Sequence, residues 1–407
     1  MKFLFQKQNV IREAVLLLLL SFISFNPIFS QIVENIFQEN KSIDPDRKGN
    51  LSVEIDNLTF FKNNEYEGEI MKGYTLPGFW LNGKVVYYPL ENIKLEAGAH
   101  TLYYYGTKRY PSYAYLDIAE WNPDSYQHGI RILPFFRAHV ALSSNVDLIL
   151  GNIYGGSNHQ LIEPLYNSEL NLTADPEMGA QFLYHSPVFD ADVWVNWESF
   201  IFRNDTHQEA FTFGFSTRIK YNNSQSRFHF YSPVQALAQH RGGEIDTIQT
   251  NSVHTLMNAA IGIGMEWNPG SRLFRKMSAE INGMTYYQQA GKHWPLDDGN
   301  AVHVALSALI TDFRVKAGYW KGRDFISLFG IPYYGAVSTV DQTRVYQNPS
   351  TVYLGFEYTR TFAEHYALGI DVDFYKPQAD GLGSKSSFSA GIYLRVNPSF
   401  LLKKYYP

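Results

Sequence analysis

Histidine, arginine, lysine and carboxylate residues recur at every second position in several stretches of this chain. Imidazoles and carboxylates are the usual general acids and bases, and rings of charged side chains select ions. A tight turn at residues 222–223 would place Arg218 opposite Arg227. Because like charges across two strands are unfavourable unless an anion, water or a carboxylate neutralises them, this pair points to anion binding. The residues that we expect to share one polar, pore-lining face are Arg137, His139, Arg218, Lys220, Arg227, His229, Glu280, Arg314, Lys316, Asp371 and Asp373.

Acidic residues on the same face allow a second interpretation. Glu198, Glu266 and Asp312 have the parity of the basic residues, as do the three acidic positions already named. The face could therefore hold an internal network of ion pairs that fills the space. The sequence supports the anion-selective ring and the filling network equally.

Motifs of soluble hydrolases are absent from the sequence. There is no G-x-S-x-G nucleophile elbow, no H-E-x-x-H zinc pair and no phosphate-binding glycine loop. Residues 297–300 read Asp-Asp-Gly-Asn, which is more typical of an ordinary turn than of a calcium loop. The chain has no cysteine, which excludes thiolate metal sites and cysteine nucleophiles. We expect no cofactor, no metal and no enzymatic activity, with His139, His229 and His303 as polar lining residues.

The amino-terminal segment is typical of a signal peptide. A basic leader precedes an apolar run over residues 14–25, and Asn26 and Pro27 end it. The run is shorter than the roughly 20 residues of a membrane-spanning helix. The alternative is an uncleaved anchor. We therefore predict a signal peptide over 1–30, a polar lead-in over 31–47 and one domain over 48–407.

That domain shows the alternation of β-strands. Phe211, Phe213 and Phe215 share one face, and Phe228 and Phe230 share a face in the following stretch. A two-residue turn between these stretches would pair Phe215 with Phe230, because Asn tolerates the positive φ that such a turn needs.

A change of parity at residues 311–312 predicts a second tight turn. It keeps His303, Ser307, Arg314 and Lys316 on one side. Counting all such stretches gives about 16 strands, and their lengths suit the roughly 9–11 residues that cross a membrane. Three connections are too long for turns: 106–127, 155–177 and 322–350. The last is apolar enough that we expect it to fold inside or over the barrel mouth.

The apolar face recurs without charged interruption, whereas the other face carries charges together with small residues. The first property suits lipid and the second suits an enclosed lumen; a secreted soluble β-protein is the alternative. Because strands in lipid must close to satisfy their backbone, we predict an all-β, antiparallel transmembrane barrel in the outer membrane, with membrane lipid as a partner. The net charge of -5 implies no nucleic-acid partner.

The predicted strand number, the opposed lumenal charges and the inward-folding loop resemble the porins and porin-like barrels of Gram-negative bacteria. The segment 74–105, beginning Tyr-Thr-Leu-Pro-Gly-Phe, is similar to barrels of Bacteroidota-like bacteria. The resemblance implies a channel for diffusion of small polar solutes, either a homo-oligomer such as a trimer or a monomer, and the arginines of the polar face would add a preference for anions. The alternative is a plugged interaction barrel that binds a protein of the cell envelope. A barrel enzyme is the third hypothesis, and the missing nucleophile motif counts against it.

Overall fold

The computed structural model describes residues 32–105, 130–199, 208–243, 253–362, 364–383 and 385–405. The predicted signal peptide over 1–30 and the predicted long connection over 106–127 lie outside these residues. Within the described part of the chain, no helix is both long enough and apolar enough to cross a membrane.

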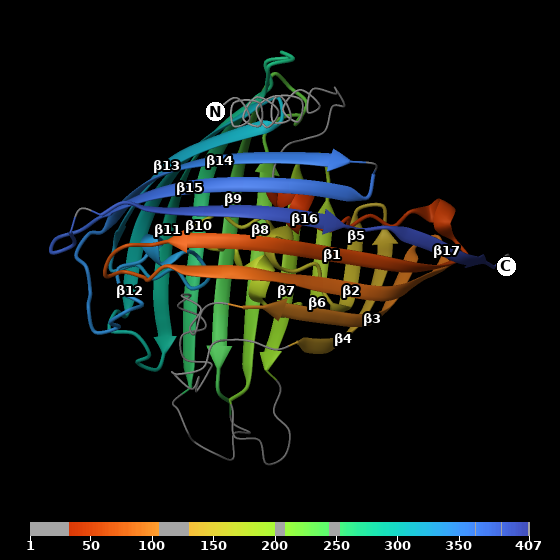
Figure 1. The fold of residues 1–407 in the computed structure, drawn as a ribbon, viewed down its shortest axis with the longest axis horizontal. Coiled ribbons are helices and arrows are strands. Elements are labelled where there is room, and N and C mark those ends of the chain that lie inside the picture. The colour runs from red at the N-terminus through yellow and green to blue at the C-terminus, as the bar shows by residue number, and fades with distance from the viewer. Residues whose placement is uncertain are drawn as a thin grey trace, which may run out of the picture.

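The described chain forms one antiparallel sheet that closes on itself (Figure 1). Each strand pairs with its neighbours along the chain, and β1 pairs with both β2 and the last strands. The strands are β1 Asn50–Glu65, β2 Tyr74–Leu90, β3 Ile93–Tyr104, β4 Arg131–Ser143, β5 Val146–Asn152, β6 Met178–His185, β7 Phe189–Ser199, β8 Ala210–Lys220, β9 Phe228–Arg241, β10 His254–Trp267, β11 Phe274–Ala290, β12 Asp298–Ile310, β13 Phe313–Arg323, β14 Ser350–Phe362, β15 Tyr366–Gln378, β16 Ser387–Val396 and β17 Ser399–Lys404.

The last two strands are halves of one interrupted strand. Both pair with β1, where Val396 of β16 lies opposite Asn57 and Ser399 of β17 lies opposite Glu54. Pro398 interrupts the strand because it has no N–H to donate, yet its carbonyl accepts from Ile55 N at 3.1 Å. The 17 segments therefore make a closed barrel of 16 strands, as expected from the sequence.

The two ends of the barrel differ in their connections. One end has short turns, such as residues 91–92, 144–145 and 311–312, and the other has loops such as 153–177 and 324–349. In outer-membrane barrels the short turns face the periplasm and the long loops face outside. The end at which β9 finishes and β10 begins is therefore the outer end.

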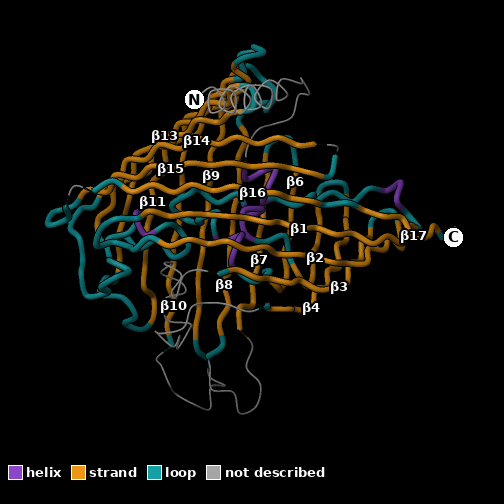
Figure 2. The backbone as a smooth tube through the Cα atoms, viewed as in Figure 1, coloured by secondary structure: helices purple, strands orange, loops and turns teal. Residues whose placement is uncertain are grey.

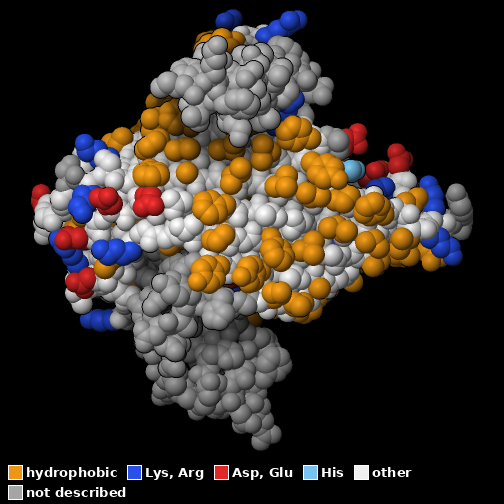
Figure 3. All heavy atoms as spheres, in the orientation of Figure 1, with side chains coloured by type: hydrophobic (Ala, Val, Ile, Leu, Met, Phe, Trp, Pro, Cys, Tyr) orange, Lys and Arg blue, Asp and Glu red, His pale blue; other side chains and the backbone are white. Residues whose placement is uncertain are grey.

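The outer wall is apolar, as predicted. Ile132, Ile261 and Ile263 are 68%, 63% and 64% exposed, which a soluble protein would avoid on this scale. Figure 3 shows this apolar band over β1–β3 and β14–β16, with charged side chains gathered toward its two ends. The apolar row of every hairpin thus faces lipid and the polar row faces the lumen.

The register of the β8–β9 hairpin differs from the prediction. Phe215 pairs with Ala236 rather than Phe230, and Arg218 pairs with Pro233 rather than Arg227. The connection is a wide turn over residues 221–227, because the Asn222 side chain bonds across it to Phe228 O at 2.6 Å and Phe230 N at 2.9 Å. The parity is unchanged, so the faces are correct although the partners are wrong. The turn at residues 311–312 is tight as predicted, with Ile310 opposite Phe313.

The lumen is filled by three segments that are not strands, visible as short helices and loops inside the barrel (Figure 2). The lead-in 32–49 enters it, and the loops 153–177 and 324–349 fold into it from the outer end. Fully buried side chains come from all three segments: Ile36, Tyr154, Leu165, Leu172, Phe325, Ile326 and Leu328.

Candidate functional site

The predicted pore-lining residues face the lumen, with one exception. Arg227 lies in the wide turn before β9, where its carbonyl accepts from Asn268 N at 2.8 Å. Arg218 instead pairs with Glu266 at 2.6 Å and stacks on the Tyr231 ring at 3.5 Å. The expected pair of opposed arginines therefore does not form.

The remaining lumenal charges have partners close by. Arg314 lies 3.6 Å from Glu357, and Lys220 lies 2.6 Å from Asp190. The other predicted residues are likewise held: Glu280 accepts from Tyr231 at 2.7 Å, His229 contacts Asn222 at 3.1 Å, and His139 contacts Tyr154 at 3.1 Å. The network that fills the lumen, rather than an anion-selective ring, is the arrangement that these residues adopt.

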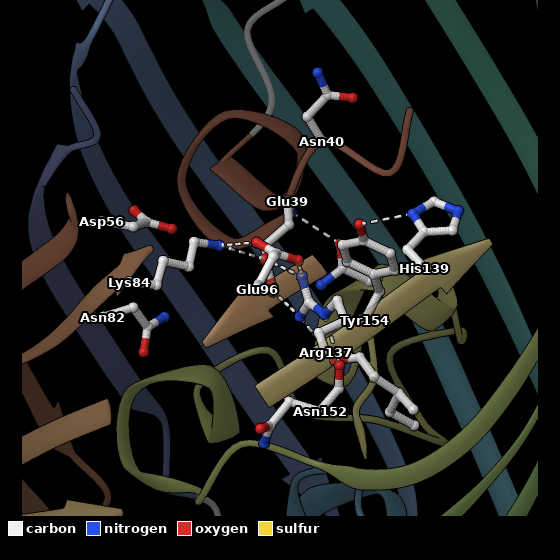
Figure 4. Close-up of polar contacts among 12 residues, drawn as sticks. Glu39, Asn40, Asp56, Asn82, Lys84, Glu96, Arg137, His139, Asn152 and Tyr154 are labelled. Atoms are coloured by element: carbon white, nitrogen blue, oxygen red, sulfur yellow. Dashed lines mark hydrogen bonds and ion pairs between the residues drawn. The ribbon is translucent and has the colours of Figure 1, made fainter. Parts of the chain in front are cut away.

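One part of this network anchors the lead-in near the periplasmic end. Arg137 Nη1 lies 2.9 Å from Glu39 and 3.2 Å from Glu96, and its guanidinium stacks on Tyr154 at 3.9 Å. Lys84 binds Glu96 at 2.6 Å from the other side. Figure 4 shows these groups converging from the lead-in and strands β2, β3 and β4, with Tyr154 between Arg137 and His139. Burial would raise the pKa of Glu39, but Arg137 and Lys84 outweigh it and lower that pKa to about 2.

A second cluster surrounds a small cavity of about 100 Å³ in the middle of the lumen. Lys316 reaches Glu163 at 2.9 Å, Asp373 at 3.1 Å and Glu357 at 3.5 Å. Lys62 binds Asp371 at 2.9 Å nearby. A cavity of this size holds a few water molecules and has no room for an acyl chain.

A third cluster places a histidine between two carboxylates. His159 Nδ1 lies 3.0 Å from Asp192 and its Nε2 lies 3.1 Å from Glu177, while its ring stacks on Trp194 at 3.5 Å. Burial would lower the pKa of His159, but the two carboxylates outweigh it and raise that pKa to about 9. Both nitrogens then carry protons, so this histidine has no lone pair with which to act as a base. Among the described residues, no group of three or more histidine or acidic side chains is arranged to hold a metal ion.

A different kind of site lies on the lipid-facing wall at the outer end. One row of directly paired residues crosses four strands there: Trp197 of β7 pairs with Phe211 of β8, Phe211 with His240 of β9, and His240 with Thr255 of β10. His240 Nδ1 lies 2.8 Å from Thr255 Oγ1. The His240 and Phe211 rings lie 5.0 Å apart, and the Phe211 and Trp197 rings lie 5.2 Å apart. An imidazole hydrogen-bonded to a hydroxyl is the arrangement that activates a hydroxyl nucleophile. Here the pair extends the row of aromatic rings formed by Trp197 and Phe211.

The orientation of this pair follows from the strand alternation. The residues on either side of His240, Gln239 and Arg241, are 1% and 5% exposed and face the lumen. His240 itself is half-buried and points outward with Ala236 and Ala238. A histidine in this row is exceptional, because the rest of the row on β9 is apolar or small.

A carboxylate lies one step farther toward the outer end. Glu209 stands opposite Gly242, whose N–H donates to the Glu209 carbonyl at 2.8 Å. A β-carbon added at Gly243 would lie 3.0 Å from Glu209 Oε2, so this carboxylate bends over the end of β9. Thr255, His240 and Glu209 thus follow one another across three adjacent strand ends.

Residues 43–405 match the model of the family described as Lipid A 3'-O-deacylase-type. The chain belongs to this family. The match covers the whole barrel and part of the lead-in. No curated protein matches the chain in sequence.

Membership of this family overturns two expectations from the sequence. The family name specifies ester hydrolysis, so the predictions of a porin-like channel and of a non-enzymatic barrel are wrong. The motifs that the sequence lacks belong to helices and strand-to-helix turns of soluble hydrolases. A barrel wall can bring side chains together from adjacent strands, which leaves no local signature in the sequence.

Several solved outer-membrane proteins have a weak structural similarity to the chain. A loop-deletion mutant of OmpT from Vibrio cholerae has 12% identity and a TM-score of 0.45, over 86% of this chain and 99% of that one. OccAB1 and OccAB2 from Acinetobacter baumannii have 10% and 11% identity, each with a TM-score of 0.46. They cover 89% and 87% of this chain and 99% of their own. Similarity at this level does not bear on activity.

Sequence reasoning missed His240 and Thr255 because it considered histidines only on the polar face. The signal was present: Phe228, Phe230, Val234 and His240 all have even numbers in one strand. Extending that row by parity places an imidazole on the face that meets lipid.

Proposed function

We propose that this protein hydrolyses the ester between an acyl chain and the 3'-oxygen of lipid A, using the lipid-facing pair His240 and Thr255. The observation that carries the proposal is the 2.8 Å contact between His240 Nδ1 and Thr255 Oγ1 on the outer half of the apolar wall. Family membership supplies the reaction class.

The position of the pair suits a substrate that is itself part of the membrane. Below the row, Phe213 and Met257 are 41% and 37% exposed and offer an apolar surface along which an acyl chain can lie. Above the row, Glu209 and the outer loops meet the aqueous side. The ester of a lipid in the outer leaflet lies at this boundary, so the lipid need not leave the membrane to react.

The reaction follows from the two side chains, Thr255 and His240. Thr255 Oγ1 attacks the ester carbonyl carbon while its proton passes to His240 Nδ1. Collapse of the tetrahedral intermediate breaks the bond to the sugar 3'-oxygen, and His240 returns the proton to that oxygen. A water molecule, deprotonated by His240, then releases the acyl chain from Thr255 as a fatty acid.

Glu209 has a supporting role. It lies one step beyond His240 toward the outer end, where its negative charge can stabilise the imidazolium that forms after the first proton transfer.

The test is fatty-acid release from lipid A by the purified, folded protein in detergent micelles. His240→Asn should lower kcat by about 10²–10⁴-fold, the usual effect of removing a general base. Thr255→Val keeps the shape of the side chain but removes the hydroxyl, so release should stop, whereas Thr255→Ser should retain it. Glu209→Gln should lower kcat less than His240→Asn does.

Thr285→Val is the matched control. Thr285 is also an outward-facing threonine of a neighbouring strand, but its hydroxyl donates to Gly299 O at 3.2 Å and touches no histidine that the structure describes. This variant should be as active as the wild type. Release at the wild-type rate by both His240→Asn and Thr255→Val would disprove the proposed site. Release of other acyl esters but never of a lipid A chain would disprove the proposed substrate.

A further inference from the structure

We propose that Lys321, Arg323 and Lys376 form a binding ridge for the phosphate groups of outer-leaflet lipid. The ridge lies on the lipid-facing wall over β13–β15, which run side by side (Figure 1). It is separate from the His240 row, and binding at the ridge does not depend on the proposed hydrolysis.

The geometry comes from the strand register. Lys321 lies opposite Ser350, and Val352 of the same strand lies opposite Lys376, so the two lysines flank β14 with an offset of two residues. With a strand spacing of about 4.8 Å, the two strands that carry them are roughly 10 Å apart. Arg323 follows two positions after Lys321 on the same outward row.

Each cation lies at the point where the apolar wall ends. Tyr319, Val352 and Phe374 are 42%, 47% and 46% exposed, and they lie below or between the cations on the three strands. Long cationic side chains above an apolar, aromatic row are typical of the headgroup level of a membrane. The ridge therefore meets headgroups rather than acyl chains or bulk water.

The cations are available to a ligand. All three residues are exposed, and Lys321 and Lys376 have no ion-pair partner among the described residues. Arg323 has a loose contact of 3.6 Å with Asp324, and its side chain is 73% exposed. Because both side chains are exposed to water, the contact between Arg323 and Asp324 contributes little free energy. An anionic ligand can therefore bind without breaking a strong internal ion pair.

The outward rows of nearby strands carry no cation at this level. β12 presents Asn300 and, above it, Asp298; β11 presents Tyr287 and Gln289, and β1 presents Glu65. The positive charge is thus confined to one sector of the described wall. Three cations at the headgroup level match a lipid that carries phosphate, and we assign the outer-leaflet lipid, rather than free phosphate, as the ligand because the ridge stands directly above an apolar surface.

The experiment measures binding of bis-phosphorylated lipid A and of its dephosphorylated form to the full-length protein in detergent, by native mass spectrometry. The ridge variant combines Lys321→Gln, Arg323→Gln and Lys376→Gln. The control combines Lys72→Gln, Lys292→Gln and Lys385→Gln, which removes the same charge from exposed loop residues at the same end. All proteins carry His240→Asn, so that turnover cannot alter the lipid.

At about 1 kcal/mol per cation near a charged surface, the ridge variant should bind the phosphorylated lipid on the order of 100-fold more weakly. Its binding of the dephosphorylated lipid should be unchanged, and the control should match the parent for both lipids. Equal loss for both lipids, or no loss for either, would overturn the ridge. Full competition by millimolar inorganic phosphate would also overturn it, because the site would then select free phosphate. None of these results depends on whether the unmodified protein releases a fatty acid.

Discussion

At the scale of single residues, the environment of each imidazole decides what it can do. His159 is held between Asp192 and Glu177 and is protonated, so its role is to bind the loop 153–177 to the wall. His240 contacts the Thr255 hydroxyl through Nδ1 and has no ion pair with a carboxylate among the described residues. The same side chain is thus structural in the lumen and, in our proposal, a general base on the outer wall.

This contrast predicts a specific pH dependence of stability. The pKa of His159 is raised from 6.5 to about 9 by Asp192 and Glu177 against the effect of burial, with Lys41 also facing Asp192 at 3.8 Å. A raised pKa contributes stability that is fully present below pH 6.5 and is lost as the pH rises through 9. The free energy of unfolding in urea should therefore fall by roughly 3 kcal/mol between pH 6.5 and pH 10.

His159→Gln is the comparison for that measurement. It should be less stable than the wild type at pH 6.5, but its stability should change less over the same pH range because the titrating group is absent. Parallel curves for the two proteins would show that His159 is not the source of the dependence.

At the scale of elements, the lead-in is held by ion pairs more than by its own helices, which are single turns. Arg137 is the centre of that anchor, and its side chain is 1% exposed. Removing one partner of a buried ion pair leaves uncompensated charge in a medium of low dielectric constant. The position of the lead-in should therefore depend strongly on Arg137, although Arg395 also donates to Ile36 O and Gln38 O.

Arg137→Met should lower the free energy of unfolding by about 3–5 kcal/mol, as judged from urea titrations monitored by tryptophan fluorescence. Arg131→Met is the control, because its pair with Asp175 is exposed and is worth no more than about 1 kcal/mol. Equal losses for the two variants would contradict the anchoring role.

The strands also differ in which of their features the sequence could predict. Strand faces were predictable because alternation is local: the rows of Phe211 and Phe228 point outward as expected. The register of β8 and β9 was not predictable. It depends on hydrogen bonds of the Asn222 side chain across the turn, and the alternation of apolar and polar residues does not report such contacts.

The contents of the lumen were only partly predictable. The apolar composition of 322–350 indicated that it would fold inward, but its partners are set by side-chain contacts from distant strands. The pair His240 and Thr255 escaped detection because its two members lie on different strands and share no motif. Parity alone could have placed both on the lipid face.

At the scale of the whole molecule, the filled lumen and the apolar outer wall have different roles. The interior fixes the shape, and in our proposal the outer surface binds the substrate. Purified protein in a planar bilayer should show no steady conductance steps, because the lead-in and two loops occupy the lumen. A variant that lacks residues 32–40 should conduct more often. Steady conductance by the intact protein, equal to that of the deletion variant, would contradict the filled lumen.

The most direct test of the central claim is the mass spectrum of lipid A extracted from Gram-negative cells that produce either the wild-type protein or the variant Thr255→Val at equal levels in the outer membrane. Wild-type cells should contain lipid A that has lost one acyl chain, with the free hydroxyl at the 3'-position. Cells with the variant should retain the complete lipid. Identical spectra from the two strains would contradict the claim that Thr255 and His240 deacylate lipid A.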